Sequence, residues 1–275
     1  LKQHHPAAFM AAVLSSDMEK TDKVVTLIDE CARMGLTVEP PDVNASQFMF
    51  TVSGPKAIRY GLGAIKGVGE GAVENMIAER TAGGRFRSVR DFCRRIDLKQ
   101  ANRRVLEALI RAGALDSLGA NRATLMHQLP GAMQAAEQHS RAQAAGQDDL
   151  FGLAAPAAPA AALAEDPAEP SETLPEWSEK VRLAGERETL GLYLTGHPIT
   201  EYERELRPIT SGRIADIGGA KPVGGNDGGW RGPGKNVTVA GLVLEIRKRG
   251  NRNSCVLDDR SGRIEVTLFE DVYQQ

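Results

Sequence analysis

Two glycines frame a single apolar residue in the segment Ile65-Lys66-Gly67-Val68-Gly69, directly before a stretch with helical periodicity. Because glycine has no Cβ atom, the amides of Gly67 and Gly69 can approach a phosphate group closely. The N-terminus of the following helix adds the positive end of its dipole, and Lys66 adds a full charge. This pattern is typical of a helix-hairpin-helix element, which contacts the sugar-phosphate backbone of DNA and not its bases.

Other interpretations of this glycine pair depend on its surroundings. A glycine-rich joint between two core helices would use the same residues, and this alternative stays open. A dinucleotide-binding fingerprint would need a parallel βαβ unit, which the surrounding sequence does not indicate. A Walker A loop needs Gly-Lys followed by Ser or Thr, which is absent here.

Positive charge is concentrated after this segment. The whole chain has a net charge of −2, yet residues 80–111 contain ten basic and three acidic residues, a local balance of +7. Residues 147–188 have the opposite balance, −7. A phosphate-facing surface explains this asymmetry, and a solvated basic face is the alternative. We expect four arginines to contact DNA together with Lys66, Gly67, Val68 and Gly69: Arg85, Arg87, Arg103 and Arg104.

A short peptide in a polar surround ends in two apolar residues. Its sequence is Gln147-Asp148-Asp149-Leu150-Phe151, and an Ala/Pro-rich stretch follows it. Burying two such side chains in a partner's pocket would contribute roughly 3–6 kcal/mol before ordering costs. The peptide therefore has the form of a releasable docking anchor. The pattern is equally compatible with Leu150 and Phe151 folding back onto the preceding helices.

The C-terminal part of the chain changes to a strand pattern. We expect strands at residues 237–246, 254–258 and 264–269, with a tight turn at Asp258-Asp259-Arg260-Ser261-Gly262. Three successive antiparallel strands are typical of the first half of an OB-type barrel. A basic turn that begins with Arg247, Lys248 and Arg249 would border its single-strand groove, and a solvated hairpin loop is the alternative.

Helices should position the glycine pair and the basic run. We expect residues 1–35 to be helical with Gly35 as the cap, followed by a hairpin of residues 48–52 and 58–62 around Gly54-Pro55. Further helices are predicted at residues 72–80, 89–95, 103–112, 122–129 and 176–194, with a weak helix or linker at 132–145. A second, degenerate glycine turn is predicted at Gly113-Ala114-Leu115, and two turns in tandem would hold both strands of a duplex.

Catalytic and metal-binding patterns are not found in the sequence. The five histidines are scattered, and the three cysteines, Cys31, Cys93 and Cys255, are far apart, so we expect neither a metal site nor catalytic residues. The sparse cysteines suit a reducing cytoplasm. No apolar run reaches the roughly 18–20 residues of a membrane span, and no signal peptide opens the chain. The chain begins with Leu1 and stops within the strand-rich region, so we interpret it as an internal piece of a longer protein.

Four segments resemble the alpha subunits of bacterial replicative DNA polymerase III: LGAIKGVGEG at Leu62–Gly71, NRRVLE at Asn102–Glu107, GERETLGLYLTGHP at Gly185–Pro198 and LDDRSG at Leu257–Gly262. The resemblance implies a multidomain α+β fold. Its parts would be the C-terminal end of the fingers (1–60), a tandem helix-hairpin-helix module (61–130), a clamp-binding peptide with its linker (131–175), a helical connector with a Gly-rich loop (176–235) and the N-terminal part of an OB domain (236–275).

The resemblance also implies partners and an activity. Primer-template DNA, the sliding clamp (beta subunit) and other replisome subunits would be the partners, with Gln147–Phe151 as the clamp peptide and no membrane contact. The parent would be a DNA-directed DNA polymerase with Mg²⁺ in a palm domain upstream of this piece, and the piece itself would hold no cofactor. The error-prone paralogue of the subunit and a non-enzymatic interaction scaffold remain the alternatives.

Overall fold

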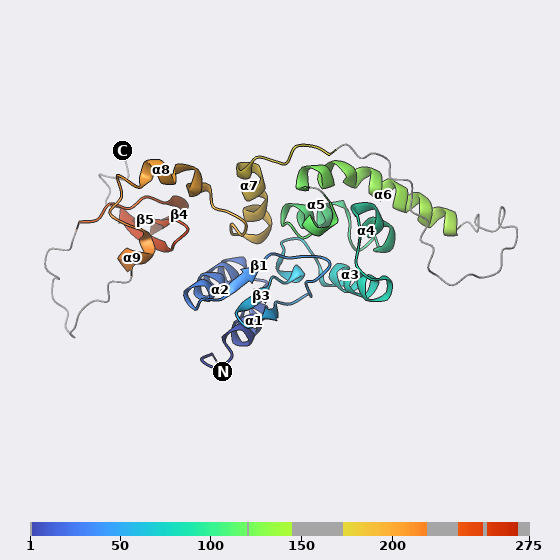
Figure 1. Cartoon of the computed structure of the whole chain (residues 1–275), viewed down its shortest axis with the longest axis horizontal. Coiled ribbons are helices and arrows are strands. Elements are labelled where there is room, and N and C mark those ends of the chain that lie inside the picture. Colours follow the sequence, from blue (N-terminus) through green and yellow to red (C-terminus); the bar gives the residue numbers. More distant parts are fainter. Residues whose placement is uncertain (1, 120, 145–172, 219–235, 250–251, 269–275) are drawn as a thin grey trace, which may run out of the picture. The chain divides into compact units, whose positions relative to one another are not determined.

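The computed structural model describes residues 2–119, 121–144, 173–218, 236–249 and 252–268 (Figure 1). The chain divides into two compact units, Leu1–Thr195 and Gly196–Gln275. Each unit contains helices and one small three-stranded sheet, which confirms the predicted α+β class. The domain boundaries that we expected after residues 60, 130 and 175 all lie inside the first unit, and the boundary after residue 235 lies inside the second.

The first unit opens with two helices and a three-stranded sheet. The predicted helical region 1–35 consists of α1 (Pro6–Ser16) and α2 (Thr21–Arg33). The predicted hairpin around Gly54-Pro55 is present as β2 (Thr51–Gly54) and β3 (Ala57–Arg59), which pair antiparallel. Its strands lie closer to the turn than the predicted ranges 48–52 and 58–62. A short strand that the sequence did not indicate, β1 (Thr37–Glu39), pairs parallel with the other side of β3.

The end of α2 is set by its cap. The amide of Gly35 donates to the carbonyl of Ala32 at 3.0 Å, and the amide of Leu36 donates to the carbonyl of Cys31 at 2.9 Å. This pair of bonds satisfies carbonyls that would otherwise lack a partner at the helix end. The predicted role of Gly35 as a C-terminal cap is thereby confirmed.

Five longer helices build the rest of the first unit: α3 (Glu70–Gly83), α4 (Val89–Arg95), α5 (Arg103–Arg111), α6 (Arg122–Ala144) and α7 (Glu179–Leu190), with short 3-10 helices η1 (Leu62–Ala64) and η2 (Asp116–Leu118). Side chains define two of the starts. Ser88 Oγ accepts the amide of Asp91 at 3.1 Å, and Asn102 Oδ1 accepts the amide of Arg104 at 3.0 Å. The α6 helix continues through residues 132–144, which were predicted as only a weak helix or a linker.

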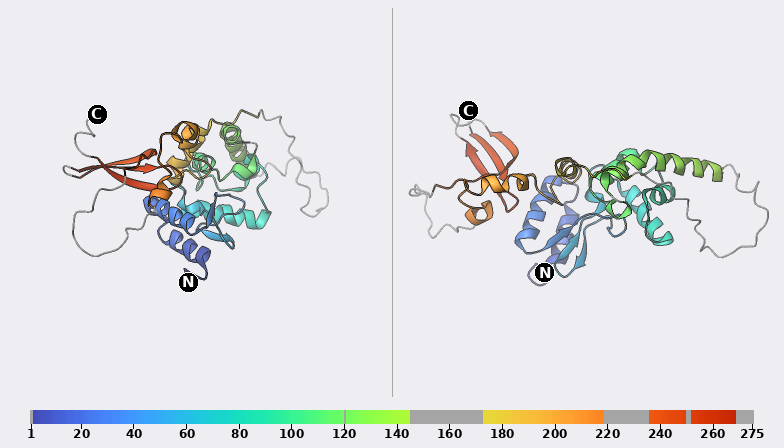
Figure 2. Two further views of the ribbon diagram at one scale, coloured as in Figure 1. Left: turned by 60° about the vertical axis from the view of Figure 1, so that its left-hand side comes forward. Right: turned by 45° about the horizontal axis from the view of Figure 1, so that its top comes forward.

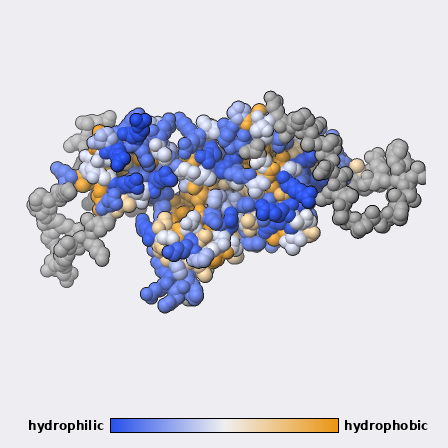
Figure 3. All heavy atoms as spheres, in the orientation of Figure 1, coloured by the Kyte–Doolittle hydropathy of each residue, from blue (hydrophilic) through white to orange (hydrophobic). Residues whose placement is uncertain are grey.

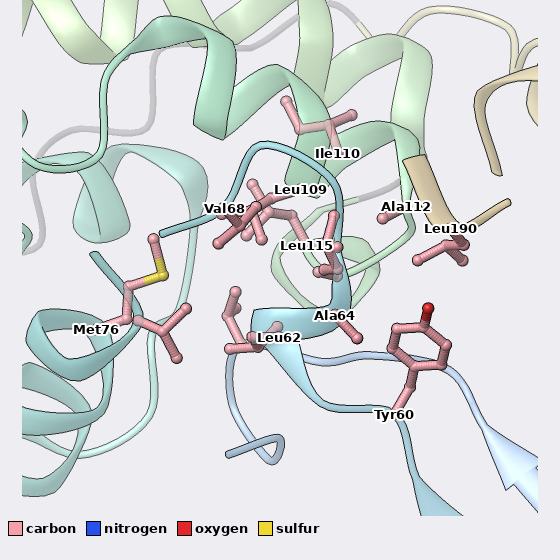
Figure 4. Packing of buried hydrophobic residues seen from close by; sticks show 14 of the residues in the cluster. Tyr60, Leu62, Ala64, Val68, Met76, Leu109, Ile110, Ala112, Leu115 and Leu190 are labelled. Carbon is pink, nitrogen blue, oxygen red and sulfur yellow. The ribbon is translucent and has the colours of Figure 1, made fainter. Parts of the chain in front are cut away.

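One hydrophobic core joins these elements. Figure 4 shows Val68, on the loop before α3, beside Leu109 of α5, and Leu190 at the end of α7 near Ala112 and Tyr60. These side chains are buried, so the loop before α3 is fixed to the core by its apolar residues. Hydrophilic residues cover most of the described surface in the view of Figure 3, with smaller hydrophobic areas between them.

The second unit is built on an antiparallel sheet with the order β4-β5-β6 (Figure 2). Its elements are η4 (Pro198–Tyr202), α8 (Glu203–Leu206), α9 (Ile214–Gly218), β4 (Leu242–Arg249), β5 (Arg252–Asp258) and β6 (Arg263–Leu268). The three strands follow one another as predicted. The first of them, β4, begins and ends later than the predicted range 237–246. Assignment to an OB barrel stays a prediction.

All three cysteines of the chain are free thiols and are buried. Burial raises the pKa of the Cys31 thiol to about 11 and that of the Cys93 thiol to about 12. Thiols with such pKa values are almost entirely protonated at neutral pH, so Cys31 and Cys93 serve as small apolar core residues.

Candidate nucleic-acid interface

The segment Ile65–Val68 forms a tight turn that requires glycine at its third position. The amide of Val68 donates to the carbonyl of Ile65 at 3.1 Å, and Gly67 has a φ of +83°. This combination is that of a type II turn, in which only glycine adopts the third position without strain. Ile65 and Val68 are buried at the base of the turn, whereas Lys66 and Gly67 are exposed at its tip.

The turn leads directly into the N-terminus of α3. Gly69 is the N-cap residue with extended backbone angles, and no side chain caps the helix. The first amides of a helix have no partners within it, so those of α3 are available to an incoming anion. A Cβ atom added at Gly67 or Gly69 would meet no other atom within 4 Å. Both glycines thus leave open space, as the phosphate-contact prediction requires.

The N-terminus of α5 lies beside that of α3. A Cβ atom at Gly71 would be 2.8 Å from Oε1 of Gln100, which lies three residues before the start of α5, and the amide of Asp97 donates to Asn75 Oδ1 of α3 at 2.7 Å. The exposed side chains of Arg103 and Arg104 stand in the first turn of α5. Arg103 donates to Glu107 Oε1 at 2.8 Å. We call the predicted residues at the starts of these two helices the hairpin surface: Lys66, Gly67, Gly69, Arg103 and Arg104.

Two predicted arginines are not part of the hairpin surface. Arg85 and Arg87 are exposed, but they follow the C-terminal end of α3. A helix of 14 residues is about 21 Å long, so these cations lie about that far from the N-terminus of α3. Val68 is also a correction to the predicted set, because its side chain is buried and its amide is used within the turn.

Several cations of the basic run stabilise the fold. Arg80 donates to the carbonyls of Val43 and Ser46 at 2.7 and 2.9 Å, and burial lowers the pKa of its guanidinium. Arg95 lies 4.5 Å above the ring centre of Phe86 and donates to the carbonyl of Gly84. The local charge of +7 therefore overstates the charge that this region offers to a ligand.

The second glycine turn is closed to ligands. Gly113 is buried between α5 and η2, and a Cβ atom there would be 2.2 Å from Nη2 of Arg122. The guanidinium of Arg122 thus fills the space over Gly113 that a phosphate would need. This geometry contradicts the prediction that the Gly113-Ala114-Leu115 turn offers a second backbone contact to DNA.

The predicted basic turn of the second unit is part of a strand. Arg247 and Lys248 lie in β4, where they pair with Ser254 and Asn253 of β5, and the backbone of Arg249 closes the strand. Arg247 forms an ion pair with Glu245 at 2.8 Å. Lys248 is exposed, and the two residues expected at the tip of the turn, 250 and 251, lie outside the described residues.

Comparison with known proteins identifies the family. Residues 35–125 match the helix-hairpin-helix motif family. The chain is 50% identical over 279 residues to the DNA polymerase III subunit alpha of Vibrio cholerae, an alignment that covers 98% of this chain and 22% of that protein. It is 49% identical over 287 residues to the same subunit of Escherichia coli K12, with 100% and 23% covered. The chain belongs to the DNA polymerase III subunit alpha family. It spans less than a quarter of the length of these relatives.

A buried ion-pair network, which the sequence did not indicate, holds α7 in this member of the family. Arg122 donates to Glu186 Oε1 at 3.0 Å and pairs with Asp116 at 2.9 Å. Burial opposes the charge of Arg122, but its two carboxylate partners raise the pKa of the guanidinium above its ordinary value. Glu186 also accepts the amides of Leu194 and Thr195, so one carboxylate joins α6, α7 and the chain that leaves α7.

Two of the segments that carried the resemblance to the family meet in the second unit. His197 Nε2 lies 3.2 Å from Asp258 Oδ1, and His197 Nδ1 accepts the amide of Ile199 at 3.2 Å. Asp258 also accepts Nε of Arg263 at 2.8 Å. Burial lowers the pKa of His197 below its ordinary value, although the charge of Asp258 opposes that shift. The lowered pKa keeps the imidazole neutral at neutral pH, and its buried Nε2 lies close to Asp258 without meeting the geometry of a hydrogen bond.

The remaining predictions concern the clamp peptide, metals and membranes. The clamp-binding residues Gln147–Phe151 lie outside the described residues. Among the residues that the structure describes, no three His, Cys, Asp or Glu side chains come together in a way that could hold a metal ion. No helix in the described ranges is both long and apolar enough to span a membrane.

Proposed function

We propose that this chain is the part of a DNA polymerase III alpha subunit that holds duplex DNA by its sugar-phosphate backbone. The exposed glycine turn at the start of α3, together with the exposed Arg103 and Arg104 in the first turn of α5, is the observation that carries the proposal. Open main-chain amides, a helix N-terminus and guanidinium groups are the donors that bind phosphate without reading bases. The match of residues 35–125 to the helix-hairpin-helix motif family supports the same function.

The proposal extends to the larger protein through the names of its relatives. We propose that the parent is a DNA-directed DNA polymerase, that its palm domain and Mg²⁺ site lie outside this chain, and that it works in the cytoplasm with other replisome subunits. Gln147–Phe151 would bind the sliding clamp and keep the enzyme on DNA. The second unit, with Lys248 exposed on β4, would guide the single-stranded template.

A salt titration tests the duplex contact. Backbone binding releases counterions, so the affinity of the 275-residue chain for a duplex should fall steeply between 50 and 200 mM salt, roughly in proportion to the number of phosphates contacted. Lys66→Glu with Arg103→Glu should weaken binding about a hundredfold, because each adds a repulsive charge to the hairpin surface.

The control for each of the two substitutions is Lys56→Glu, which makes the same charge change as either of them alone at an exposed lysine in the turn between β2 and β3. We expect it to retain nearly the affinity of the wild type. A duplex affinity that does not depend on salt, or equal retention of DNA by the double variant and the wild type, would support the scaffold alternative.

A further inference from the structure

Two backbone hydrogen bonds of different origin hold the Ile65–Val68 turn. One is internal, from the amide of Val68 to the carbonyl of Ile65. In the other, the amide of Lys66 donates to the carbonyl of Thr189 at 2.9 Å. Thr189 belongs to the last turn of α7, which is distant in sequence from the hairpin surface. The orientation of the turn therefore depends on α7 as well as on its own residues.

The end of α7 can supply this acceptor because of its place in the helix. The last carbonyls of a helix have no partner within it, and that of Thr189 is one of them. Thr189 is only 4% exposed, and its hydroxyl donates to the carbonyl of Gly185 at 2.7 Å. Leu190 is fully buried beside Tyr60 and Ala112 (Figure 4). The acceptor is thus held in one place by the core.

The helix itself is fixed from two further sides. Glu186 is buried and pairs with Arg122 of α6. Gly191 ends the helix with a φ of +79°, and a Cβ atom there would be 2.2 Å from Cγ2 of Thr21 in α2. The helix that accepts the Lys66 amide is therefore held in place by contacts with both α2 and α6.

We propose that the C-terminal turn of α7 is a positioning element for DNA binding, and that its Thr189 carbonyl holds the Ile65–Val68 turn with the amides of Gly67 and Gly69 facing outward. This inference rests on the proposed function of the hairpin surface. Thr189 acts through Lys66 and touches no nucleic acid itself.

The first test separates the amide of Lys66 from its charge. Lys66→Ala removes the charge and keeps the N–H donor, whereas Lys66→Pro removes both. Proline is favoured at the second position of a type II turn, and the extended backbone of Ile65 is compatible with a following proline, so the turn itself can persist. The proline ring would occupy the path of the bond to Thr189. We expect Lys66→Pro to bind duplex DNA about fivefold more weakly than Lys66→Ala.

The second test loosens α7 without touching the hairpin surface. Gly191→Ala forces a Cβ atom against Thr21, and Gly35→Ala is its control, because Gly35 also has a positive φ after a helix but has open space around it. Hydrogen exchange of the Lys66 amide should become about tenfold faster in Gly191→Ala and stay unchanged in Gly35→Ala. Duplex affinity should fall only in Gly191→Ala, and a general loss of stability would affect both variants.

The outcomes separate the two claims. If Lys66→Ala weakens DNA binding and Lys66→Pro weakens it no further, the positioning role is overturned while the proposed function stands. If Lys66→Ala binds DNA like the wild type, the proposed function is in error. Hydrogen exchange of the Lys66 amide in Gly191→Ala then still tests whether α7 holds the turn. Unchanged exchange at Lys66 in folded Gly191→Ala would overturn the positioning role by itself.

Discussion

At the scale of single residues, Arg122 and Glu186 form an ion pair that is buried inside the first unit. Their side chains are 2% and 0% exposed, and removing one would leave the other as a buried charge. We expect Arg122→Met to lower the free energy of unfolding by about 3–5 kcal/mol, because the charge of Glu186 would lose its partner. Urea unfolding followed by circular dichroism measures this loss.

The matched control is Arg141→Met on the same helix, whose pair with Glu137 has side chains that are 82% and 54% exposed. Its loss should be below about 0.5 kcal/mol, because solvent screens such pairs. Equal losses in the two variants would show that the buried network contributes no more than an exposed pair. Adding Glu186→Gln to Arg122→Met should restore part of the stability, since no uncompensated charge then remains.

His197 gives the second unit a pH dependence whose sign follows from its pKa. The folded pKa is lowered, chiefly by burial, while the unfolded value is about 6.5. The unfolded chain then binds the proton more readily, so stability is complete above about pH 6.5 and falls as the pH drops below it. Hydrogen exchange of the β5 amides between pH 7.5 and 5 should detect this fall, after correction for intrinsic rates. His197→Gln should flatten it.

The exposed His127 of α6 provides the control for that experiment. His127→Gln should leave the pH profile of the β5 amides unchanged. The charged groups near His197 have opposite effects on its pKa, since Asp258 favours the protonated imidazole and Arg260 and Arg263 oppose it. Parallel profiles for the wild type and His197→Gln would show that another group causes the pH dependence.

At the scale of elements, substitutions at the N-terminus of α3 should change the stability of the helix and its affinity for DNA in opposite directions. Gly69 has the extended angles of an N-cap residue. Gly69→Ser and Gly69→Asp should stabilise α3 by a few tenths of a kcal/mol, because their side chains can cap it. The same side chains compete with phosphate for the first amides, so duplex affinity should fall about threefold for Ser and more than about tenfold for Asp. Fluorescence anisotropy and thermal unfolding measure the two effects.

Gly131→Asp is the charge-matched control, because Gly131 of α6 is exposed and also has open space around it. Its effect on duplex affinity should be small. If Gly69→Asp binds the duplex as tightly as Gly131→Asp, the start of α3 does not contact phosphate.

The sequence predicted best where the signal is local. The helices predicted at 89–95 and 103–112 begin at the predicted residues, where the side chains of Ser88 and Asn102 cap them, and the predicted hairpin at Gly67 is a turn with a positive φ. The three-residue strand β1 is too short to show a pattern, and the end of β4 depends on pairing with β5.

At the candidate site, the glycine turn was predictable and its supports were not. Lys66 and Thr189 meet through backbone atoms, which no side-chain pattern encodes. Arg122 and Glu186 are 64 residues apart. Arg80 and Arg95 look like ligand-facing cations in the sequence, and only packing shows that they bind backbone carbonyls.

At the scale of the whole molecule, the proposed clamp tether makes a prediction that does not depend on the hairpin surface. Leu150→Ala combined with Phe151→Ala should abolish measurable binding to the sliding clamp, because these apolar side chains supply roughly 3–6 kcal/mol of the contact. Duplex binding and the circular dichroism spectrum should stay as in the wild type. Surface plasmon resonance on immobilised clamp measures the loss.

Leu163→Ala, which removes a leucine from the nearby Ala/Pro-rich stretch, is the control and should bind the clamp normally. Clamp affinity that survives the double substitution would place the contact elsewhere in the protein.

The buried cysteines have a practical consequence for such measurements. Cys31, Cys93 and Cys255 are all shielded by the fold, and the high pKa values of Cys31 and Cys93 leave almost no thiolate at neutral pH. Maleimide dyes react with thiolates. A single cysteine introduced at an exposed site such as Arg85 would therefore be labelled selectively in the otherwise native chain. Fluorescent reporters for single-molecule work can thus be attached without first building a cysteine-free background.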